Sequence, residues 1–309
     1  MNKKNLLFQK LERFMIFCKR NDFLNKFIRK PLQFFWYRGI DLFFYIRMLI
    51  LGHYCKLKIG SNFMIVDLRD KIISRKLYIF GVYEIEETKL FNKLIKKNMT
   101  VFDLGANIGY YTVLFSQLVG EGGKVLAIEP SIRNYNLIMQ NIDLNNFNNV
   151  ICVNKAVTDK PKEVEMIISN EGYGLNRINF TKNDLSSFDE IQKSVKGVPL
   201  SDIAKEYSIT PDIIKMDIEG SEYLALQGMK EILSNNENII LVCEYNPQAL
   251  ENSGTQPHLF IEELAELGFK FFKIENNCVL KDIQPKQIVA SVNKGENINL
   301  LISKTIPKI

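Results

Sequence analysis

The stretch TVFDLGANIGYYT, from Thr100 to Thr112, has the pattern of a short apolar strand, a loop with two glycines and the start of a helix. A loop of this kind between a strand and a helix is typical of a nucleotide site. The dinucleotide fingerprint G-x-G-x-x-G has a glycine where this loop has Asn107. The Gly-Lys-Ser/Thr ending of a phosphate-binding P-loop is also absent. The pattern therefore indicates a different nucleotide.

A carboxylate stands at the mouth of this loop, because Asp103 precedes Gly105. It would repel a phosphate and would suit a ligand with an ammonium group, such as S-adenosylmethionine. The open backbone from Gly105 to Gly109 can face the methionine moiety, and the helix N-terminus favours its carboxylate. Glu129 ends the next strand, 20 residues beyond Gly109, and can accept hydrogen bonds from ribose hydroxyls. The predicted cofactor-binding residues are Asp103, Gly105, Asn107, Gly109, Tyr111, Thr112, Glu129 and Asp217.

Apolar runs of strand length alternate with helical patterns from Thr100 onward, which predicts a parallel sheet covered by helices on both faces. Residues 57–86 look β-rich, in KLKIGSNFMIVDLRD and KLYIFGVYE, and residues 84–97 have the apolar spacing of a helix. We expect three parts: a basic, aromatic, helical segment at 1–56, a β-rich lead-in with a helix at 57–98, and a catalytic domain at 99–309.

The first fifty residues contain 11 basic and 3 acidic side chains, a net charge of +8, so the remaining 259 residues carry −3. Because the basicity belongs to one end, we expect no nucleic-acid partner. Arg38, Asp41 and Arg47 interrupt the apolar run at residues 31–52, so we predict neither a membrane span nor a signal peptide. Two interpretations are open: an interfacial helix on an anionic membrane, or an arm packed on the main domain or on a second subunit.

Five scattered cysteines without a CxxC pair favour a reducing, cytoplasmic compartment, either free or at the membrane surface.

Four motifs together resemble the FkbM-type methyltransferases: VFDLGANIGYYT, AIEPSIRNYNLIMQNI, IIKMDIEGSEYLALQGM and CEYNP. The resemblance covers about residues 65–275. It implies a class I methyltransferase fold, an α/β, Rossmann-like and mostly parallel sheet, here preceded by an N-terminal helical arm. It also implies S-adenosylmethionine-dependent O-methylation of a hydroxyl, often of a sugar or glycan. The motifs do not identify the acceptor.

Two other functions are compatible with such a fold. A nicotinamide oxidoreductase is disfavoured by Asp103 and by the missing central glycine of the loop. A non-catalytic assembly protein is disfavoured because Asp103, Glu129 and Asp217 are all intact. We therefore expect an enzyme.

The strand DIIKMDIEG carries Lys215, Asp217 and Glu219 at alternate positions, which share one side of an extended strand. Charges at the end of a buried strand are costly unless they are paired or functional. Asp217 is expected either in the active site or in an ion pair with Lys215, and Glu219 either as a base or as a charge at the next helix N-terminus.

Two further candidates follow along the chain. Glu244 ends the next strand, with a salt bridge to Lys215 as its alternative role, and His258 begins a helix, where it could equally be a cap or a surface residue. The loop SNEGYGLNRINF offers Tyr173, Asn176 and Arg177 to an acceptor, or is an ordinary solvated loop. No metal-ligand spacing is present. The predicted catalytic residues are Asp217, Glu219, Glu244 and His258.

Overall fold

The computed structural model describes residues 30–169, 177–178, 189–292 and 297–306. The chain forms two compact units, Met1–Tyr83 and Glu84–Ile309. The helix predicted at residues 84–97 is thus part of the same unit as the strands that follow it. Each unit is described by itself.

The first unit combines helices with a small hairpin. Its described elements are α3 (Lys30–Leu51), β1 (Tyr54–Ile59), β2 (Asn62–Asp67) and α4 (Ile73–Phe80), and β1 and β2 pair antiparallel. Phe44 of α3 is buried, and the guanidinium of Arg75 on α4 lies 4.7 Å from its ring centroid. Arg75 also forms an ion pair of 2.5 Å with Asp41, so α3 and α4 are fixed to each other by stacking and by charge.

The sequence KLYIFGVYE, which looks β-rich, lies mostly in the helix α4, so this part of the prediction was wrong. The carboxylate of Asp70 accepts hydrogen bonds from the backbone N–H groups of Ile72, Ile73 and Ser74, at 2.7 to 3.2 Å. These bonds satisfy the free donors of the first helical turn. The helix ends at Gly81, which has a left-handed φ of 71°. The caps at both ends thus override the strand propensity of Tyr, Ile and Phe.

The second unit is built around an eight-stranded sheet in the order β13-β12-β14-β11-β10-β3-β4-β5. These strands are β3 (Thr100–Leu104), β4 (Lys124–Ile128), β5 (Val150–Val153), β10 (Ile213–Met216), β11 (Ile240–Tyr245), β12 (Lys270–Glu275), β13 (Val279–Asp282) and β14 (Ile298–Ser303). The helices are α5 (Ile85–Leu94), α6 (Tyr110–Val119), α7 (Ile132–Leu144), α8 (Leu200–Glu206), α9 (Glu222–Ser234), α10 (Pro247–Asn252), α11 (Pro257–Glu266) and α12 (Pro285–Val292).

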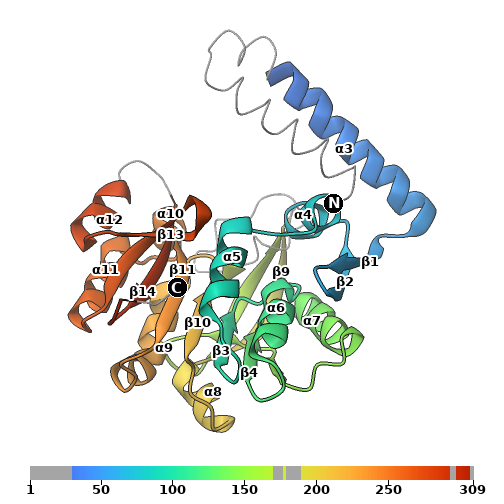
Figure 1. Ribbon diagram of the computed structural model, residues 1–309. Coiled ribbons are helices and arrows are strands. Elements are labelled where there is room, and N and C mark those ends of the chain that lie inside the picture. The colour runs from blue at the N-terminus through green and yellow to red at the C-terminus, as the bar shows by residue number, and fades with distance from the viewer. Residues whose placement is uncertain (1–29, 170–176, 179–188, 293–296, 307–309) are drawn as a thin grey trace. The chain divides into compact units, whose positions relative to one another are not determined.

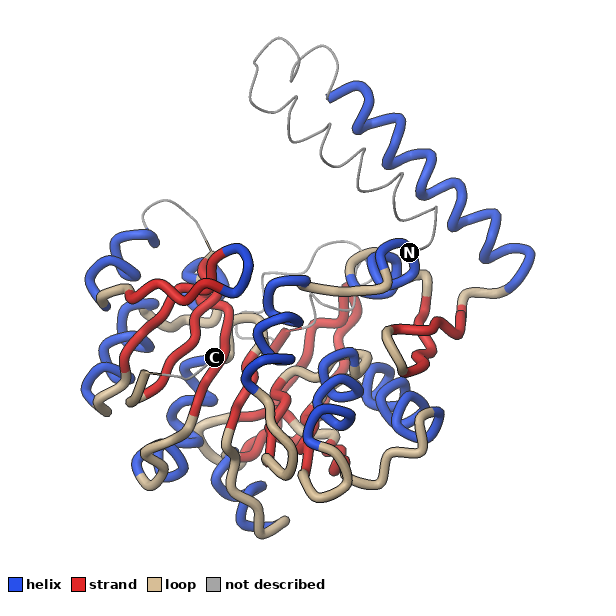
Figure 2. Tube along the Cα trace, in the orientation of Figure 1, coloured by secondary structure: helices blue, strands red, loops and turns tan. Residues whose placement is uncertain are grey.

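The five strands from β5 to β11 are parallel, whereas β14 runs antiparallel between β11 and β12. Helices α5, α6 and α7 cover one face, and α8, α9 and α11 cover the other (Figure 1; Figure 2). The strands are apolar almost throughout, as expected of a sheet buried on both faces. This is the order and direction of strands in the class I methyltransferase fold, so the predicted fold class is confirmed.

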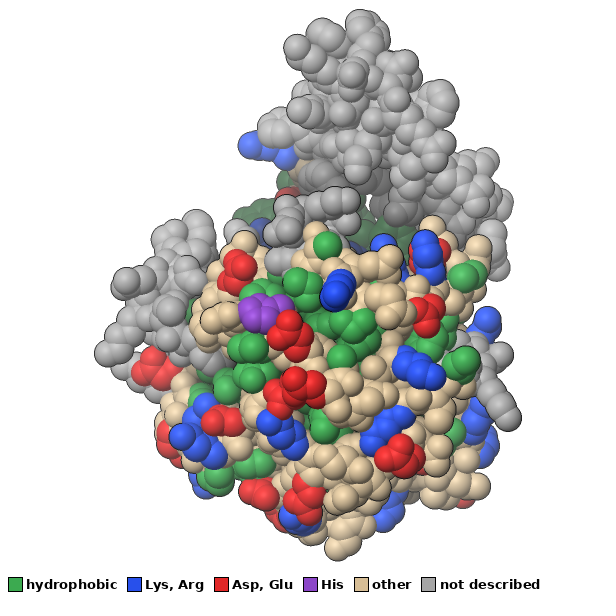
Figure 3. Space-filling view, turned by 90° about the vertical axis from the view of Figure 1, so that its left-hand side faces the viewer, with side chains coloured by type: hydrophobic (Ala, Val, Ile, Leu, Met, Phe, Trp, Pro, Cys, Tyr) green, Lys and Arg blue, Asp and Glu red, His purple; other side chains and the backbone are tan. Residues whose placement is uncertain are grey.

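A second, four-stranded sheet has the order β6-β9-β7-β8, from β6 (Ala156–Val157), β7 (Lys162–Ser169), β8 (Arg177–Ile178) and β9 (Asp189–Val198). Tyr173 and Asn176, which belong either to an acceptor site or to an ordinary solvated loop, lie outside the described residues. Acidic and basic side chains are interspersed over the face of the second unit shown in Figure 3, as on an ordinary solvated surface. Within the described ranges, no helix combines the length and the apolar content needed to cross a bilayer.

Candidate active site

The carboxyl ends of β3 and β10 lie side by side at the centre of the sheet. The chain leaves β3 toward β4 on one side, and it leaves β10 toward β11 on the other. The strand order therefore reverses between them, which is where open α/β sheets bind ligands. The loop 105–109 after β3 and the turn 217–221 after β10 border this point.

The loop after β3 passes very close to the end of β10. Gly105 has a φ of 75°, and a Cβ atom on it would lie 1.9 Å from the backbone oxygen of Asp217. Gly109 has a φ of 86°, and its Cβ would lie 3.3 Å from Ile138. Both positions have a left-handed backbone, which favours glycine, and at Gly105 a side chain would also collide with the backbone of Asp217. The glycines of the sequence motif are thus explained by close packing within the protein, in addition to the predicted approach of a ligand to the loop backbone.

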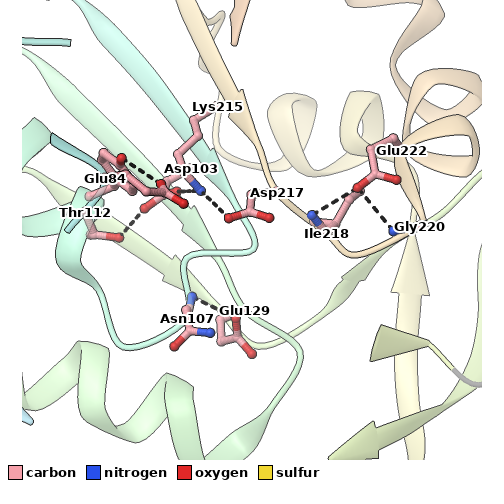
Figure 4. A network of polar contacts seen from close by, with 11 residues as sticks. Glu84, Asp103, Asn107, Thr112, Glu129, Lys215, Asp217, Ile218, Gly220 and Glu222 are labelled. Atoms are coloured by element: carbon pink, nitrogen blue, oxygen red, sulfur yellow. Dashed lines mark hydrogen bonds and ion pairs between the residues drawn. The ribbon is translucent and has the colours of Figure 1, made fainter. Parts of the chain in front are cut away.

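Asp103 lies beneath the loop and has no exposed surface. Its Oδ2 accepts a 2.7 Å hydrogen bond from the hydroxyl of Thr112, and its Oδ1 lies 3.8 Å from Nζ of Lys215 (Figure 4). Burial raises the pKa of Asp103, while Lys215 and Thr112 act in the opposite direction. The predicted contact of Asp103 and Thr112 with the cofactor stays a prediction. In the structure their side chains bind each other.

Lys215 lies between two carboxylates, since its Nζ is also 3.5 Å from Oδ2 of Asp217. Burial lowers the pKa of Lys215, but Asp217, Asp103 and Glu84 outweigh it and raise that pKa overall. Lys215 therefore carries its charge inside the protein. The side chain of Asp217 is 34% exposed, so this carboxylate reaches the surface of the site. The ion pair with Lys215 is therefore present, whereas an active-site role of Asp217 stays a prediction.

Glu129 lies at the carboxyl end of β4, on the far side of the loop from Lys215 (Figure 4). Its two oxygens accept 2.9 Å hydrogen bonds from the backbone N–H groups of Asn107 and Ser131. Burial raises the pKa of Glu129 to about 7. The hydroxyl of Ser131 is buried and has no hydrogen-bond partner among the described residues. An acceptor with free lone pairs beside an unsatisfied hydroxyl fits a ribose with two hydroxyl groups.

A pocket opens between the carboxyl ends of β10 and β11 and the helices α5 and α6. It is lined by Glu84, Glu87, Phe91, Tyr111, Lys215, Met216, Asp217, Val242, Cys243, Glu244 and Asn299. The hydroxyl of Tyr111 donates a 2.9 Å hydrogen bond to Glu84, and Nζ of Lys215 lies 4.9 Å from the centroid of the Tyr111 ring. The pocket is acidic because its lining contains four acidic side chains and one lysine. It therefore suits the cationic, amino-acid end of S-adenosylmethionine as well as a ligand rich in hydroxyls.

Two glutamates at the site have a left-handed backbone, with φ values of 43° at Glu84 and 50° at Glu219. Such conformations are uncommon for residues other than glycine and cluster at functional sites. Burial, followed by the charge of Asp217, raises the pKa of Glu84 to about 7 and the pKa of Glu219 to about 9. At neutral pH Glu219 is therefore mostly protonated and Glu84 is about half protonated, which lowers the repulsion among the acidic side chains.

Glu244 and His258, the other predicted catalytic residues, have different locations. Glu244 lines the pocket, and its side chain accepts a 3.0 Å hydrogen bond from Asn297. Burial and Asp217 raise its pKa. His258 is the second residue of α11 and is not among the described residues that line the pocket. The structure thus brings together Asp217 and Glu244 and leaves His258 apart from them.

Four further residues belong to the site although no sequence motif predicts them: Glu84, Glu87, Glu222 and Asn299. Glu222 is buried at the start of α9, where it accepts hydrogen bonds from the backbone N–H groups of Ile218 and Gly220 at 3.3 and 3.2 Å. It thereby fixes the turn after β10. Asn299 lies on β14 opposite Glu244 and binds Glu87 of α5. The signal that could have identified Glu222 is an acidic residue in the first turn of a predicted helix.

The solved structures that are similar to this chain include the following three. An O-methyltransferase from Bacillus cereus in complex with SAH has 12% identity and a TM-score of 0.42, over 72% of this chain and 82% of that one. Precorrin-6y C5,15-methyltransferase from Geobacter metallireducens GS-15 has 12% identity and a TM-score of 0.39, over 72% and 87%. TYW2 of M. jannaschii in complex with AdoMet has 14% identity and a TM-score of 0.39, over 81% and 84%.

The family model of the methyltransferase FkbM domain matches residues 103–271, from the carboxylate beneath the loop into β12. This match spans more than half of the chain and includes both loops that border the site. It removes the alternative of a nicotinamide oxidoreductase. The chain therefore belongs to the FkbM methyltransferase family, and it is an enzyme whose methyl donor is S-adenosylmethionine.

Proposed function

We propose that this enzyme methylates a hydroxyl group of a sugar or glycan. One observation supports the proposal most directly: the pocket beside Asp217 is lined by Glu84, Glu87, Glu244 and Asn299, which all offer hydrogen-bond acceptors. Neighbouring hydroxyls of a sugar are donors that such groups recognise. The same carboxylates would repel the phosphates of a nucleic acid.

Glu129 and Ser131, which follow β4, would hold the ribose of the cofactor, and the acidic pocket is then left for the acceptor. When bound, S-adenosylmethionine supplies a methyl group that its sulfonium already activates. The protein's own task is therefore to align the acceptor hydroxyl and to remove its proton. Alignment alone lowers the barrier by about 7–11 kcal/mol in favourable cases.

Asp217 is our candidate for the group that orients or deprotonates the hydroxyl. It directly follows β10, and its side chain is 34% exposed. Glu219, with a pKa of about 9, is mostly protonated at neutral pH and cannot accept a proton in that form. Glu84, with a pKa of about 7, is the second candidate for the base because it is near half-ionised.

The test is to supply a methyl donor labelled with deuterium to the protein and to glycans from cells that lack it. Mass spectrometry with fragmentation then locates the label. A label on a sugar oxygen supports the proposal, whereas a label on a nitrogen or on nucleic acid contradicts it.

A variant of Asp217 distinguishes a role in methyl transfer from a role in cofactor binding. Asp217→Asn should lower turnover by about 10²–10⁴-fold while the affinity for S-adenosylhomocysteine changes little. Glu237→Gln, on an exposed surface pair with Lys304, is the control and should retain both properties. Equal losses of turnover and affinity in Asp217→Asn would remove this residue from the catalytic list.

A further inference from the structure

The first unit has a charge that is opposite to that of the second. Residues 1–83 contain 17 basic and 5 acidic side chains, a net charge of +12, whereas residues 84–309 contain 23 basic and 30 acidic side chains, a net charge of −7. The change of sign coincides with the boundary between the two compact units. The described residues of this unit, 30–83, contain 9 basic and 3 acidic side chains and so account for half of its charge, +6.

The helix α3 of this unit exposes a row of large apolar side chains. Leu42, Ile46, Leu49 and Ile50 are 58%, 47%, 68% and 72% exposed. Their spacing places them within an arc of about 100° on one side of the helix. We call these four residues the α3 stripe. Phe44, which packs against Arg75, lies on the opposite side, so the contacts that fix α3 to α4 leave the stripe uncovered by these elements.

The hairpin of the same unit mixes aromatic and basic side chains in the same way. Tyr54, Lys56 and Lys58 alternate along β1 and are all exposed. Phe63 on β2 is 39% exposed, and Nζ of Lys56 lies 4.5 Å from its ring centroid. An aromatic ring beside a lysine is suited to the boundary of a bilayer, where the ring is buried among lipid and the ammonium meets a headgroup.

The acidic residues of the described part of this unit do not oppose such a contact. Asp67 and Asp70 have no exposed surface, and Asp41 is paired with Arg75. A second copy of the described part would carry the same net charge of +6, so like charges would repel across an interface between two such surfaces. A membrane with anionic lipid has an apolar layer that suits the exposed apolar side chains and a negative charge that attracts the basic ones.

We infer that the first unit is a docking module that places the enzyme on the surface of an anionic phospholipid bilayer, with the α3 stripe inserted among the lipids. None of the described helices is suited to span the membrane, so the contact is interfacial. The basic side chains provide long-range attraction that depends on salt, and the stripe provides insertion that does not. This inference concerns only the first unit and does not depend on the identity of the acceptor.

The experiment is co-sedimentation of the full-length protein with vesicles of phosphatidylcholine, alone or with phosphatidylglycerol. We expect binding to the anionic vesicles, and we expect it to weaken when salt is raised from about 50 mM to about 500 mM. The variant Leu42→Gln, Ile46→Gln, Leu49→Gln, Ile50→Gln should lower the bound fraction about tenfold, since four apolar side chains no longer insert. The control Val279→Gln, Ile306→Gln, which changes exposed apolar residues of the second unit, should bind like the wild type.

Two measurements distinguish a lipid bilayer from the other possible partners of the α3 stripe, a second copy of the protein and a segment of the same chain. Light scattering reports the oligomeric state, and the thermal shift with S-adenosylhomocysteine reports the fold and cofactor binding of the second unit. A dimer that dissociates in the stripe variant would assign the stripe to a second copy. A stripe variant that is less stable but binds vesicles normally would assign it to a segment of the same chain. Either result, or no binding to anionic vesicles at low salt, overturns the inference.

Discussion

Lys215 and Asp103 lie directly opposite each other on the adjacent strands β10 and β3, with Nζ of Lys215 3.8 Å from Oδ1 of Asp103. Asp103 has no exposed surface and Lys215 is 6% exposed, so this pair of charges is inside the protein. A buried charge is stable only when it is paired and hydrogen-bonded. The register between β3 and β10 therefore places Lys215 where it can stabilise the buried carboxylate of Asp103.

Replacement of the lysine should destabilise the fold strongly. In Lys215→Met the carboxylate of Asp103 keeps only Thr112 as a partner among the described side chains, and we expect a loss of about 3–5 kcal/mol in the free energy of unfolding. Urea denaturation at neutral pH measures it. The double variant Asp103→Asn, Lys215→Met should recover part of the loss, because no buried charge remains. Lys205→Met, in an exposed pair with Glu231, should change the stability little.

The cofactor loop should not tolerate a methyl group at Gly105. The Cβ of Gly105→Ala would lie 1.9 Å from the backbone oxygen of Asp217, so the loop or the end of β10 must move. We expect a lower melting temperature and loss of the thermal shift with S-adenosylhomocysteine. Gly254→Ala is a matched control because Gly254 has a similar φ of 81° but open space around the Cβ position. If the two variants lose the same stability and the same affinity, strain alone explains both, and close packing at Gly105 is not the cause.

Glu129→Ala should weaken cofactor binding. It removes the carboxylate that we propose as an acceptor for the ribose, and it leaves the backbone N–H groups of Asn107 and Ser131 without that partner. Hydrogen bonds to a charged group contribute about 1.5–3 kcal/mol each, so a loss of roughly 10–100-fold in affinity is expected. Isothermal titration with S-adenosylhomocysteine measures it, and circular dichroism checks the fold. An unchanged dissociation constant would place the ribose elsewhere.

Glu84 should make the stability depend on pH near neutrality. Its pKa in the folded protein, about 7, is above the ordinary value of 4.5, so its contribution to stability is complete below pH 4.5 and is lost as the pH rises through 7. Between pH 5 and about 8 the free energy of unfolding should therefore decline less in Glu84→Gln than in the wild type. Glu129 and Glu222 have similarly raised pKa values, so part of the decline remains. Urea denaturation across this pH range measures the slopes, and parallel curves for the two proteins would contradict the assignment.

The central part of the fold and the loop after β3 were predictable because local signals suffice there. Apolar strands that alternate with helices specify a parallel sheet, and the glycines at 105 and 109 mark a turn with a left-handed backbone. The segment 73–80 was misjudged because its helix depends on one capping carboxylate, Asp70, whose effect exceeds the strand propensity of the residues after it. A capping residue can be recognised in the sequence, but the sequence does not show whether its stabilisation of the helix exceeds the strand propensity of the residues that follow.

The acidic pocket could not be predicted from the sequence because it is assembled from distant segments. Glu84 lies before the first strand of the sheet, Asp217 after β10 and Asn299 on β14. Their proximity follows from strand order and register, which no local pattern encodes. The raised pKa of Glu84 likewise depends on Asp217, which is far from it in the sequence. Periodicity predicts faces and boundaries, whereas the chemistry of this pocket comes from tertiary contacts.

The antiparallel strand β14 has a consequence for how the protein is made. It lies between β11 and β12 although it follows both of them in the chain, so those two strands leave the ribosome before the strand that joins them exists. Until β14 inserts, β11 has an open edge, and Asn299 is not yet present opposite Glu244. Domains otherwise fold largely in the order of synthesis. The acidic pocket thus forms only after Asn299 has been synthesised, and a chain that ends before residue 298 would have a divided sheet and an incomplete pocket.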